Sequence, residues 1–338
     1  METKHLAGIW KDIRNRPIVK AMGPFTLVIM ISLIFASFTP TFRTLDNALQ
    51  ISLSAAIYVI LAMGLSCVLI AGATDLSAGS VVALSGMTCC LLIRDLNAPL
   101  AVGIAVGLLT GILCGVVNGL LATRLGIVPF IATLGTQWIF RGLTNIMGEG
   151  QPVSVRNSAY EGLADRFYFI GGGRIFNIPV PVYIFLICGV ILSFILSKTV
   201  YGRNLYAVGS NDEAARLSGI GVFKTKLIAY LLCDGMAGLA GVMLAARLVS
   251  AQTSAGTGYE FEGIFAAVIG GVSLAGGEGT IIGAICGASV VAILRNGLNL
   301  NGINTFWQQV ILGVIIVIAV YIDVRRTRMQ AKDSAGLK

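Results

Sequence analysis

The feature that most constrains this chain is a series of apolar runs, each about 20 residues long, separated by polar or Gly/Pro-rich segments. An α-helix of about 20 residues is long enough to cross the hydrocarbon core of a bilayer. The sequence therefore predicts an all-α, polytopic membrane protein with about ten transmembrane helices. The expected spans are 22–38, 48–71, 78–93, 98–121, 127–147, 179–197, 225–246, 261–275, 279–298 and 305–322.

The low content of charged residues supports a lipid environment. Charged residues make up 12% of the 338 residues, whereas a soluble domain has about 25%. So few charges could not cover the surface of a chain this long in water. A large soluble core would instead show apolar stripes at helical or strand spacing, and not unbroken apolar runs.

The basic residues indicate how the chain is oriented. This placement puts 16 of the 24 Lys and Arg on one side of the membrane. Basic residues accumulate in cytoplasmic loops, so both termini are expected in the cytoplasm. Because the positive charge lies in loops and tails, the net charge of +8 does not indicate nucleic-acid binding. The 16 residues are Lys4, Lys11, Arg14, Arg16, Lys20, Arg124, Lys198, Arg203, Arg216, Lys224, Lys226, Arg325, Arg326, Arg328, Lys332 and Lys338.

The same placement divides the chain into a cytoplasmic tail (1–21), a transmembrane domain (22–323) and a second cytoplasmic tail (324–338). Two loops of the domain are long, one external (148–177) and one cytoplasmic (198–224). The first twenty residues are basic, but no small-residue cleavage site follows them. We therefore expect a retained tail rather than a signal peptide.

The sequence contains no motif that would indicate an enzyme. It lacks the GxxxxGK[ST], GxSxG and HExxH patterns, which mark phosphate, acyl-transfer and zinc sites. All seven cysteines fall inside predicted spans, where cysteine acts as a small apolar residue. We expect no catalytic residue, no cofactor and no metal, and a protein that moves a solute rather than transforming one.

A polar stripe runs along the fifth predicted span. Its residues are spaced four apart and therefore share one helix face. Polar side chains inside a membrane are candidates for lining a solute path. Interhelical hydrogen bonds, with the arginine extending outward, explain the stripe equally well. The stripe consists of Thr133, Gln137, Arg141 and Asn145.

Three other intramembrane polar residues call for an explanation. Asp75 could coordinate a solute or an ion at a broken helix, although capping the start of the third span is the simpler role. Gln308, near the start of the tenth span, joins the candidate path. Asp234 has no evident partner. The similar junctions 72–80 (GATDLSAGS) and 270–279 (GGVSLAGGEG) indicate an internal repeat around a central pathway.

Glycine recurs at every fourth position of the fourth span. Such ladders let two helix backbones approach closely. We favour packing inside one bundle, with a dimer face as the alternative. The ladder is Gly103, Gly107, Gly111, Gly115 and Gly119.

The segment SNDEAARLSGI (210–220) predicts a short cytoplasmic helix of about eight residues. Ser210 and Glu213 have the spacing of a capping box, and Gly219 is a natural terminator. Such a helix is too short to be stable alone, and Leu217 is an apolar side chain with no lipid to enter. We expect it to dock into a partner protein, with a helix on the membrane surface as the alternative.

Several segments resemble a known family of transporters. GRNLYAVGSNDEAARLSGI (202–220) resembles the cytoplasmic coupling loop of ATP-binding-cassette importer permeases, with its Glu-Ala-Ala and following Gly. Further segments resemble the ribose/xylose/galactofuranose branch of monosaccharide permeases, in the same order between about residues 45 and 323. They are DLSAGS (75–80), PFIATLGT (129–136) with FRG (140–142), AARLSGI (214–220), ARLVSAQTSAGTGYE (246–260), GGVSLAGGEG (270–279) and NGLNLNGI (296–303).

This resemblance implies a permease subunit that moves a ribose-like monosaccharide across the bacterial inner membrane by alternating access. It also implies three partners: cytoplasmic ATPase subunits, a periplasmic sugar-binding protein and a second permease copy, identical or paralogous. It assigns Glu213, Ala214, Ala215 and Gly219 to the coupling helix, to which we add Leu217 as the apolar knob.

Four arginines are expected on the outer face, where they would dock an acidic surface of the binding protein. Ordinary solvated arginines are the alternative. They are Arg156, Arg166, Arg174 and Arg247. Three other functions stay open at this stage: a permease for another solute such as branched-chain amino acids, an ion-coupled secondary transporter that uses Asp234, and a membrane scaffold.

Overall fold

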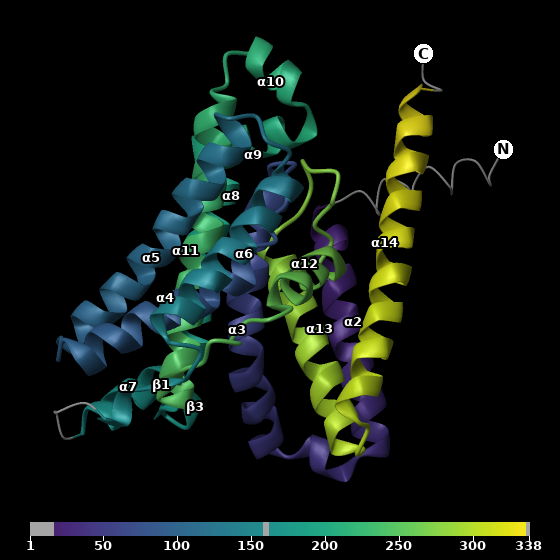
Figure 1. Cartoon of the computed structure of the whole chain (residues 1–338). Coiled ribbons are helices and arrows are strands. Elements are labelled where there is room, and N and C mark those ends of the chain that lie inside the picture. Colours follow the sequence, from purple (N-terminus) through teal and green to yellow (C-terminus); the bar gives the residue numbers. More distant parts are fainter. Residues whose placement is uncertain (1–16, 158–161, 336–338) are drawn as a thin grey trace.

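The computed structural model describes residues 17–157 and 162–335, and nearly all of its regular structure is helical (Figure 1). Two small antiparallel pairs are the exceptions, β1 (Val153–Ser154) with β4 (Ser250–Ala251) and β2 (Arg174–Ile175) with β3 (Ile178–Pro179). The α-helices are α2 (Pro17–Phe38), α3 (Leu45–Ile70), α4 (Ala78–Asp95), α5 (Leu100–Thr123), α6 (Pro129–Met147), α7 (Leu163–Gly172), α8 (Val180–Lys198), α9 (Val200–Ser210), α10 (Asp212–Leu217), α11 (Val222–Leu248), α12 (Tyr259–Ile269), α13 (Ile281–Leu300) and α14 (Thr305–Ala335), with short 3₁₀ turns at Pro40–Arg43 and Val155–Asn157.

The all-α membrane class is confirmed. Six helices of the described chain are long and apolar enough to cross a membrane: α3, α4, α5, α8, α11 and α13. Shorter apolar stretches lie in α2 and α14, at Gly23–Phe38 and Thr305–Ile315. The number of spans and the side on which the termini lie stay predictions.

The eighth predicted run is only partly helical. Its helix, α12, has 11 residues and is therefore about 16 Å long, half of what the hydrocarbon core requires. A turn-rich segment follows it up to α13. The chain thus contains a helix that begins or ends inside the bundle, which is typical of transporters with interrupted helices.

The core forms around α3 and α11. Every residue from Leu61 to Ile70 of α3 is buried, as expected for a helix that is apolar on all sides. α11 packs against α3, α4 and α5, and α3 also contacts α12 and α13. The outer faces of α5 and α8 expose large apolar side chains such as Leu113 and Val190, consistent with contact with lipid.

The glycine ladder packs inside the bundle, as the preferred interpretation predicts. A Cβ atom on Gly111 would lie 2.4 Å from the carbonyl oxygen of Asp234, and one on Gly115 would lie 2.6 Å from that of Tyr230. Real Cβ atoms do not approach so closely. The ladder therefore lets the backbones of α5 and α11 come into direct contact.

The two similar glycine-rich junctions touch each other. The N–H of Gly277 donates to the carbonyl of Ile70 over 2.9 Å, and a Cβ on Gly276 would lie 2.8 Å from the Cα of Gly72. Gly209, at the end of α9, fits against the same point, where a Cβ would lie 1.7 Å from the Ile70 oxygen. The segment that precedes α10 is thus in backbone contact with both junctions.

Candidate functional site

A cavity of about 410 Å³ lies between α6 and the segment that connects β4 to α12. It combines amide, hydroxyl, guanidinium and indole groups, so it offers both hydrogen bonds and an aromatic surface. Its lining residues are Gln137, Trp138, Arg141, Asn145, Thr253, Ser254 and Thr257. Three of the four residues in the predicted stripe therefore do share one cavity, while the hydroxyl-bearing residues come from a segment more than 100 positions away.

Arg141 anchors the far wall of this cavity. Its Nη1 donates to the carbonyl oxygens of Thr253 at 2.8 Å and Ala255 at 2.7 Å, and its Nη2 to that of Gly79 at 3.4 Å. The side chain thus reaches across to neighbouring backbone. Arg141 lies 12 residues after the start of α6 and six before its end, about 18 Å and 9 Å along the helix.

Glu260 lies directly behind the cavity and is not one of the residues that the sequence predicts to line a path. The side-chain amide of Gln137 donates to Glu260 Oε1 over 3.1 Å. This orientation leaves the Gln137 carbonyl oxygen free to accept a hydrogen bond. Glu260 is only 2% exposed, and its Oε2 has no hydrogen-bond partner among the described residues.

Two helices begin next to this site. A Cβ on Gly79, the second residue of α4, would lie 2.0 Å from Glu260 Oε2 and 2.2 Å from the carbonyl oxygen of Gly256. Gly256 precedes α12 and has a φ of 68°, which favours glycine. The starts of α4 and α12 therefore meet, and glycine is required for their approach. Non-helical backbone of this kind is tolerated in a membrane where protein or a cavity surrounds it.

Asp75 organises the start of α4 and does not line the cavity. Its Oδ1 accepts hydrogen bonds from the backbone N–H and the hydroxyl of Ser77, both at 2.7 Å. Thr133 has a similar role, because its hydroxyl accepts from the N–H of Leu76 over 3.1 Å and donates to the carbonyl of Pro129 over 2.9 Å. Both side chains are buried.

Asp234 has a hydrogen-bond partner that was not evident from the sequence. Asn118 donates from Nδ2 to Asp234 Oδ2 and to the Ser77 hydroxyl, both at 2.7 Å. The hydroxyl of Thr136 donates to Asn118 Oδ1 over 2.6 Å. A buried polar network thus joins the start of α4 to α5, α6 and α11.

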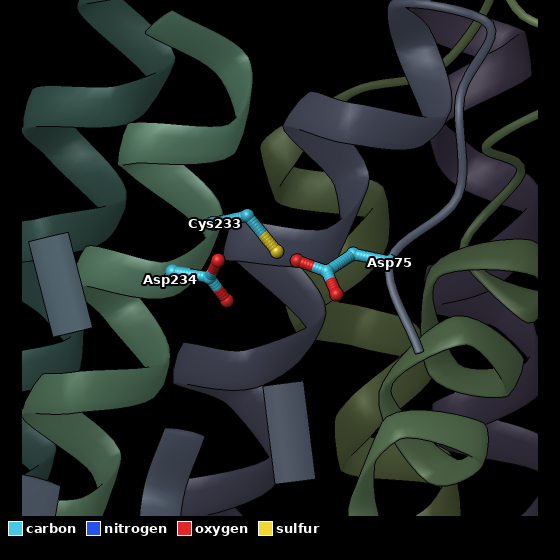
Figure 2. A group of neighbouring side chains, drawn as sticks. All are labelled: Asp75, Cys233 and Asp234. Carbon is cyan, nitrogen blue, oxygen red and sulfur yellow. The ribbon is translucent and has the colours of Figure 1, made fainter. Parts of the chain in front are cut away.

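Asp75, Cys233 and Asp234 point toward one another (Figure 2), with ligand-type atoms within 4.8 Å of each other. Asp75 Oδ2 and Asp234 Oδ1 have no hydrogen-bond partner among the described residues. Structural zinc sites use four ligands, and this group supplies three. The geometry alone assigns no metal to it.

Gln308 also lies away from the cavity. Its Nε2 donates to Asn299 Oδ1 over 2.7 Å and to the carbonyl of Ile303 over 2.8 Å. These bonds fix the turn between α13 and α14. Of the residues expected to line a path, Gln137, Arg141 and Asn145 reach the cavity, whereas Asp75, Thr133 and Gln308 hold buried backbone in place.

The short helix predicted in residues 210–220 is α10, but its start differs from the prediction. Asn211 is the N-cap, and its Oδ1 accepts from the N–H groups of Glu213 at 3.0 Å and Ala214 at 2.9 Å. Ser210 ends α9, and its hydroxyl donates to Tyr206 O. The predicted capping box is therefore wrong, because asparagine one position later fills the role. α10 has six residues.

The other residues assigned to α10 differ in exposure. Ala215 is buried, whereas the apolar side chain of Leu217 is 82% exposed. Gly219 has a φ of 80°, the left-handed conformation expected of a terminator. A cavity of about 430 Å³ adjoins α10, lined by Ala122, Thr123, Asp212, Glu213, Arg216, Val222, Phe223 and Lys226.

The four outer arginines lie at the end of the molecule opposite α10. Figure 1 shows α7 and the strands at one end, and α10 with the C-terminal end of α14 at the other. Arg156, Arg166 and Arg174 are exposed, and Arg247 is half-buried. Gly171 of α7 packs directly against the backbone of Arg247, which brings the arginine-bearing segments together.

Comparison with known proteins places the chain in a family. Residues 47–320 match the family described as "Branched-chain amino acid transport system / permease component". The chain is 39% identical over 328 residues to the ribose import permease protein of Bacillus subtilis, which covers 97% of this chain and 100% of that protein. It is 38% identical to the L-arabinose transport system permease protein of Escherichia coli K12, over 88% of each chain.

A third relative, the D-allose transport system permease protein of Escherichia coli K12, is 37% identical over 89% of this chain and 90% of that protein. No solved structure matches the chain significantly. The matches cover the described bundle from α3 to α14, and they are transport subunits rather than enzymes. The chain therefore belongs to this family of transport-system permease components and is a multi-pass protein of the inner membrane.

Proposed function

We propose that this chain is the permease subunit of an ATP-binding-cassette importer and that it carries a neutral, ribose-like monosaccharide. The observation that carries this proposal is the cavity beside α6. Its amide and hydroxyl groups match the hydroxyl groups of a sugar, and Trp138 offers a flat surface for a sugar ring. The relatives named for ribose, arabinose and allose support the same solute class.

The cavity opens on a face that a second permease copy would cover. Trp138 is 74% exposed, and Asn145 on the same face is also exposed. Polar groups on a lipid-facing surface are costly and normally line a water-filled path or an interface. We infer that two copies, identical or paralogous, place their α6 faces together and enclose the path between them.

The two ends of the molecule would bind the two other partners. α10 and its adjoining cavity present an exposed apolar knob and charged groups to the cytoplasmic ATPase. The end with α7 and the four arginines faces the periplasmic binding protein. Because Gly209 contacts both glycine-rich junctions, movement of α10 can reach the backbone at which α4 starts. Alternating access would follow from this connection.

The test is transport by the purified assembly in liposomes. We expect sugar uptake only when the ATPase, ATP and the binding protein are all present, with the ATPase co-purifying with this chain. Uptake of a branched-chain amino acid in place of sugar would assign another solute. Uptake by this chain alone under an ion gradient would contradict the proposal and identify a secondary transporter.

A further inference from the structure

Arg141 is the one ionised side chain among the residues that line the cavity beside α6. An isolated positive charge at this depth is costly, and it would attract anions into a path proposed for a neutral solute. Its hydrogen bonds to three backbone carbonyls orient the guanidinium but supply no negative charge. A buried charge normally has an opposite charge nearby.

Glu260 supplies such a charge from behind the wall. It does not line the cavity, is almost fully buried, and has one carboxylate oxygen without a hydrogen-bond partner. Glu260 Oε2 lies against Gly79, and the carbonyl of Gly79 accepts from Arg141. The Gly79 peptide therefore lies between the two side chains.

The neighbouring acidic residue is already committed elsewhere. Glu262 forms an ion pair with Arg295 on α13, and the Arg295 guanidinium also lies over the ring of Tyr58 at 5.5 Å. The charge of Glu262 is therefore balanced away from the cavity. This leaves Glu260 as the carboxylate whose charge balances that of Arg141.

We propose that Glu260 determines the specificity of the path: its buried carboxylate neutralises Arg141, so that the cavity accepts neutral polyhydroxyl solutes and does not retain anions. This inference rests on the proposed function of the cavity. Glu260 acts through Arg141 and Gln137 and is a positioning residue, not one that touches the solute. Replacing Glu260 with a neutral residue should turn the cavity beside α6 into an anion-binding site.

The test compares Glu260→Gln with wild type in the complete assembly in liposomes. Gln keeps the shape of the side chain and an acceptor for Gln137. We expect sulfate and gluconate to inhibit sugar uptake by this variant at concentrations about tenfold lower than they inhibit wild type. Glu262→Gln is the matched control, because it removes a charge two residues away that does not face Arg141; it should stay as insensitive to anions as wild type.

The second part of the test moves the carboxylate from position 260 to another position near Arg141. Asn145 lies one helical turn from Arg141 on the cavity wall, so Glu260→Gln with Asn145→Asp should recover insensitivity to anions. Asn145→Asp alone should give the opposite effect, inhibition by an organic cation such as choline, and it tests the charge balance even if the Glu260 variant fails to assemble.

Normal uptake by Glu260→Gln with no new sensitivity to anions would overturn the inference, because the backbone carbonyls would then suffice for Arg141. Failure of the proposed path has a different signature. In that case Gln137→Leu, which changes the cavity wall but no charge, would also leave uptake unchanged.

Discussion

At the scale of the residue, Asp234 shows that a sequence does not reveal which distant side chain a buried polar group will contact. It lies in the middle of an apolar helix, and its partner Asn118 is 116 positions away. A second carboxylate, Asp75, faces it, and neither forms an ion pair with any described residue. Two carboxylates in one buried site repel each other when both are ionised, so this pair opposes folding unless a proton or cation intervenes.

We therefore predict that Asp234→Asn stabilises the protein by about 1–2 kcal/mol. The asparagine carbonyl can still accept from Asn118, and its N–H can donate to Asp75 Oδ2, which has no partner now. Thermal unfolding in detergent measures the effect. Asp234→Ala is the control and should destabilise, because it leaves one N–H of the Asn118 amide without an acceptor while the other keeps the Ser77 hydroxyl. Equal destabilisation by both variants would mean that the negative charge itself is needed.

At the scale of the element, the contact between α5 and α11 depends on the glycine ladder. Gly111→Ala should destabilise the protein by about 1–3 kcal/mol, because its Cβ would clash with backbone that cannot move away. Gly235→Ala, on the facing helix α11, is the matched control: its Cβ would meet only Ile112, at an ordinary 3.5 Å. Equal unfolding temperatures for the two variants would refute this account of the packing.

α10 supports a prediction about coupling. Leu217→Asp should abolish co-purification of the ATPase, because it places an unpaired charge where an apolar side chain is expected to enter the partner. Asn211→Ala removes the N-cap and should cost about 1 kcal/mol of helix stability, with a smaller loss of ATPase. Both variants should reach the membrane in normal amounts. If Leu217→Asp bound the ATPase as well as wild type does, α10 would be an ordinary surface helix and the coupling prediction would be wrong.

The helices themselves were largely predictable, for a local reason. Apolar runs and the stripe in the fifth span depend on spacing within one helix, and both appear in α6 as expected. The N-cap was misplaced by one residue because Ser210 and Asn211 are both good caps. Which of them caps depends on where α9 ends.

The site was only half predictable, because its other half comes from distant segments. Thr253, Ser254 and Thr257 reach the cavity through a non-helical segment that has no periodicity to recognise. Glu260 accepts a hydrogen bond from Gln137, although the two residues are 123 positions apart in the sequence. The glycine at position 79 was the available signal, because a motif with glycine at a helix start implies a close neighbour.

At the scale of the whole molecule, the two regions proposed to be functional lie at separate places. The cavity beside α6 would contact the solute, whereas α10 would contact the ATPase, and Gly209 with the two junctions lies between them. Changes at the two places should therefore have separable effects. A cavity variant should impair movement of the solute without impairing assembly.

The most direct test of the account is to measure sugar uptake and ATP hydrolysis together for Gln137→Leu in liposomes containing the complete assembly. Leucine has a similar size but cannot bond to a sugar hydroxyl or to Glu260. We predict that uptake falls by at least about tenfold, while ATP hydrolysis stimulated by the binding protein stays near the wild-type rate. Wild-type uptake by this variant would contradict the claim that the solute passes along α6.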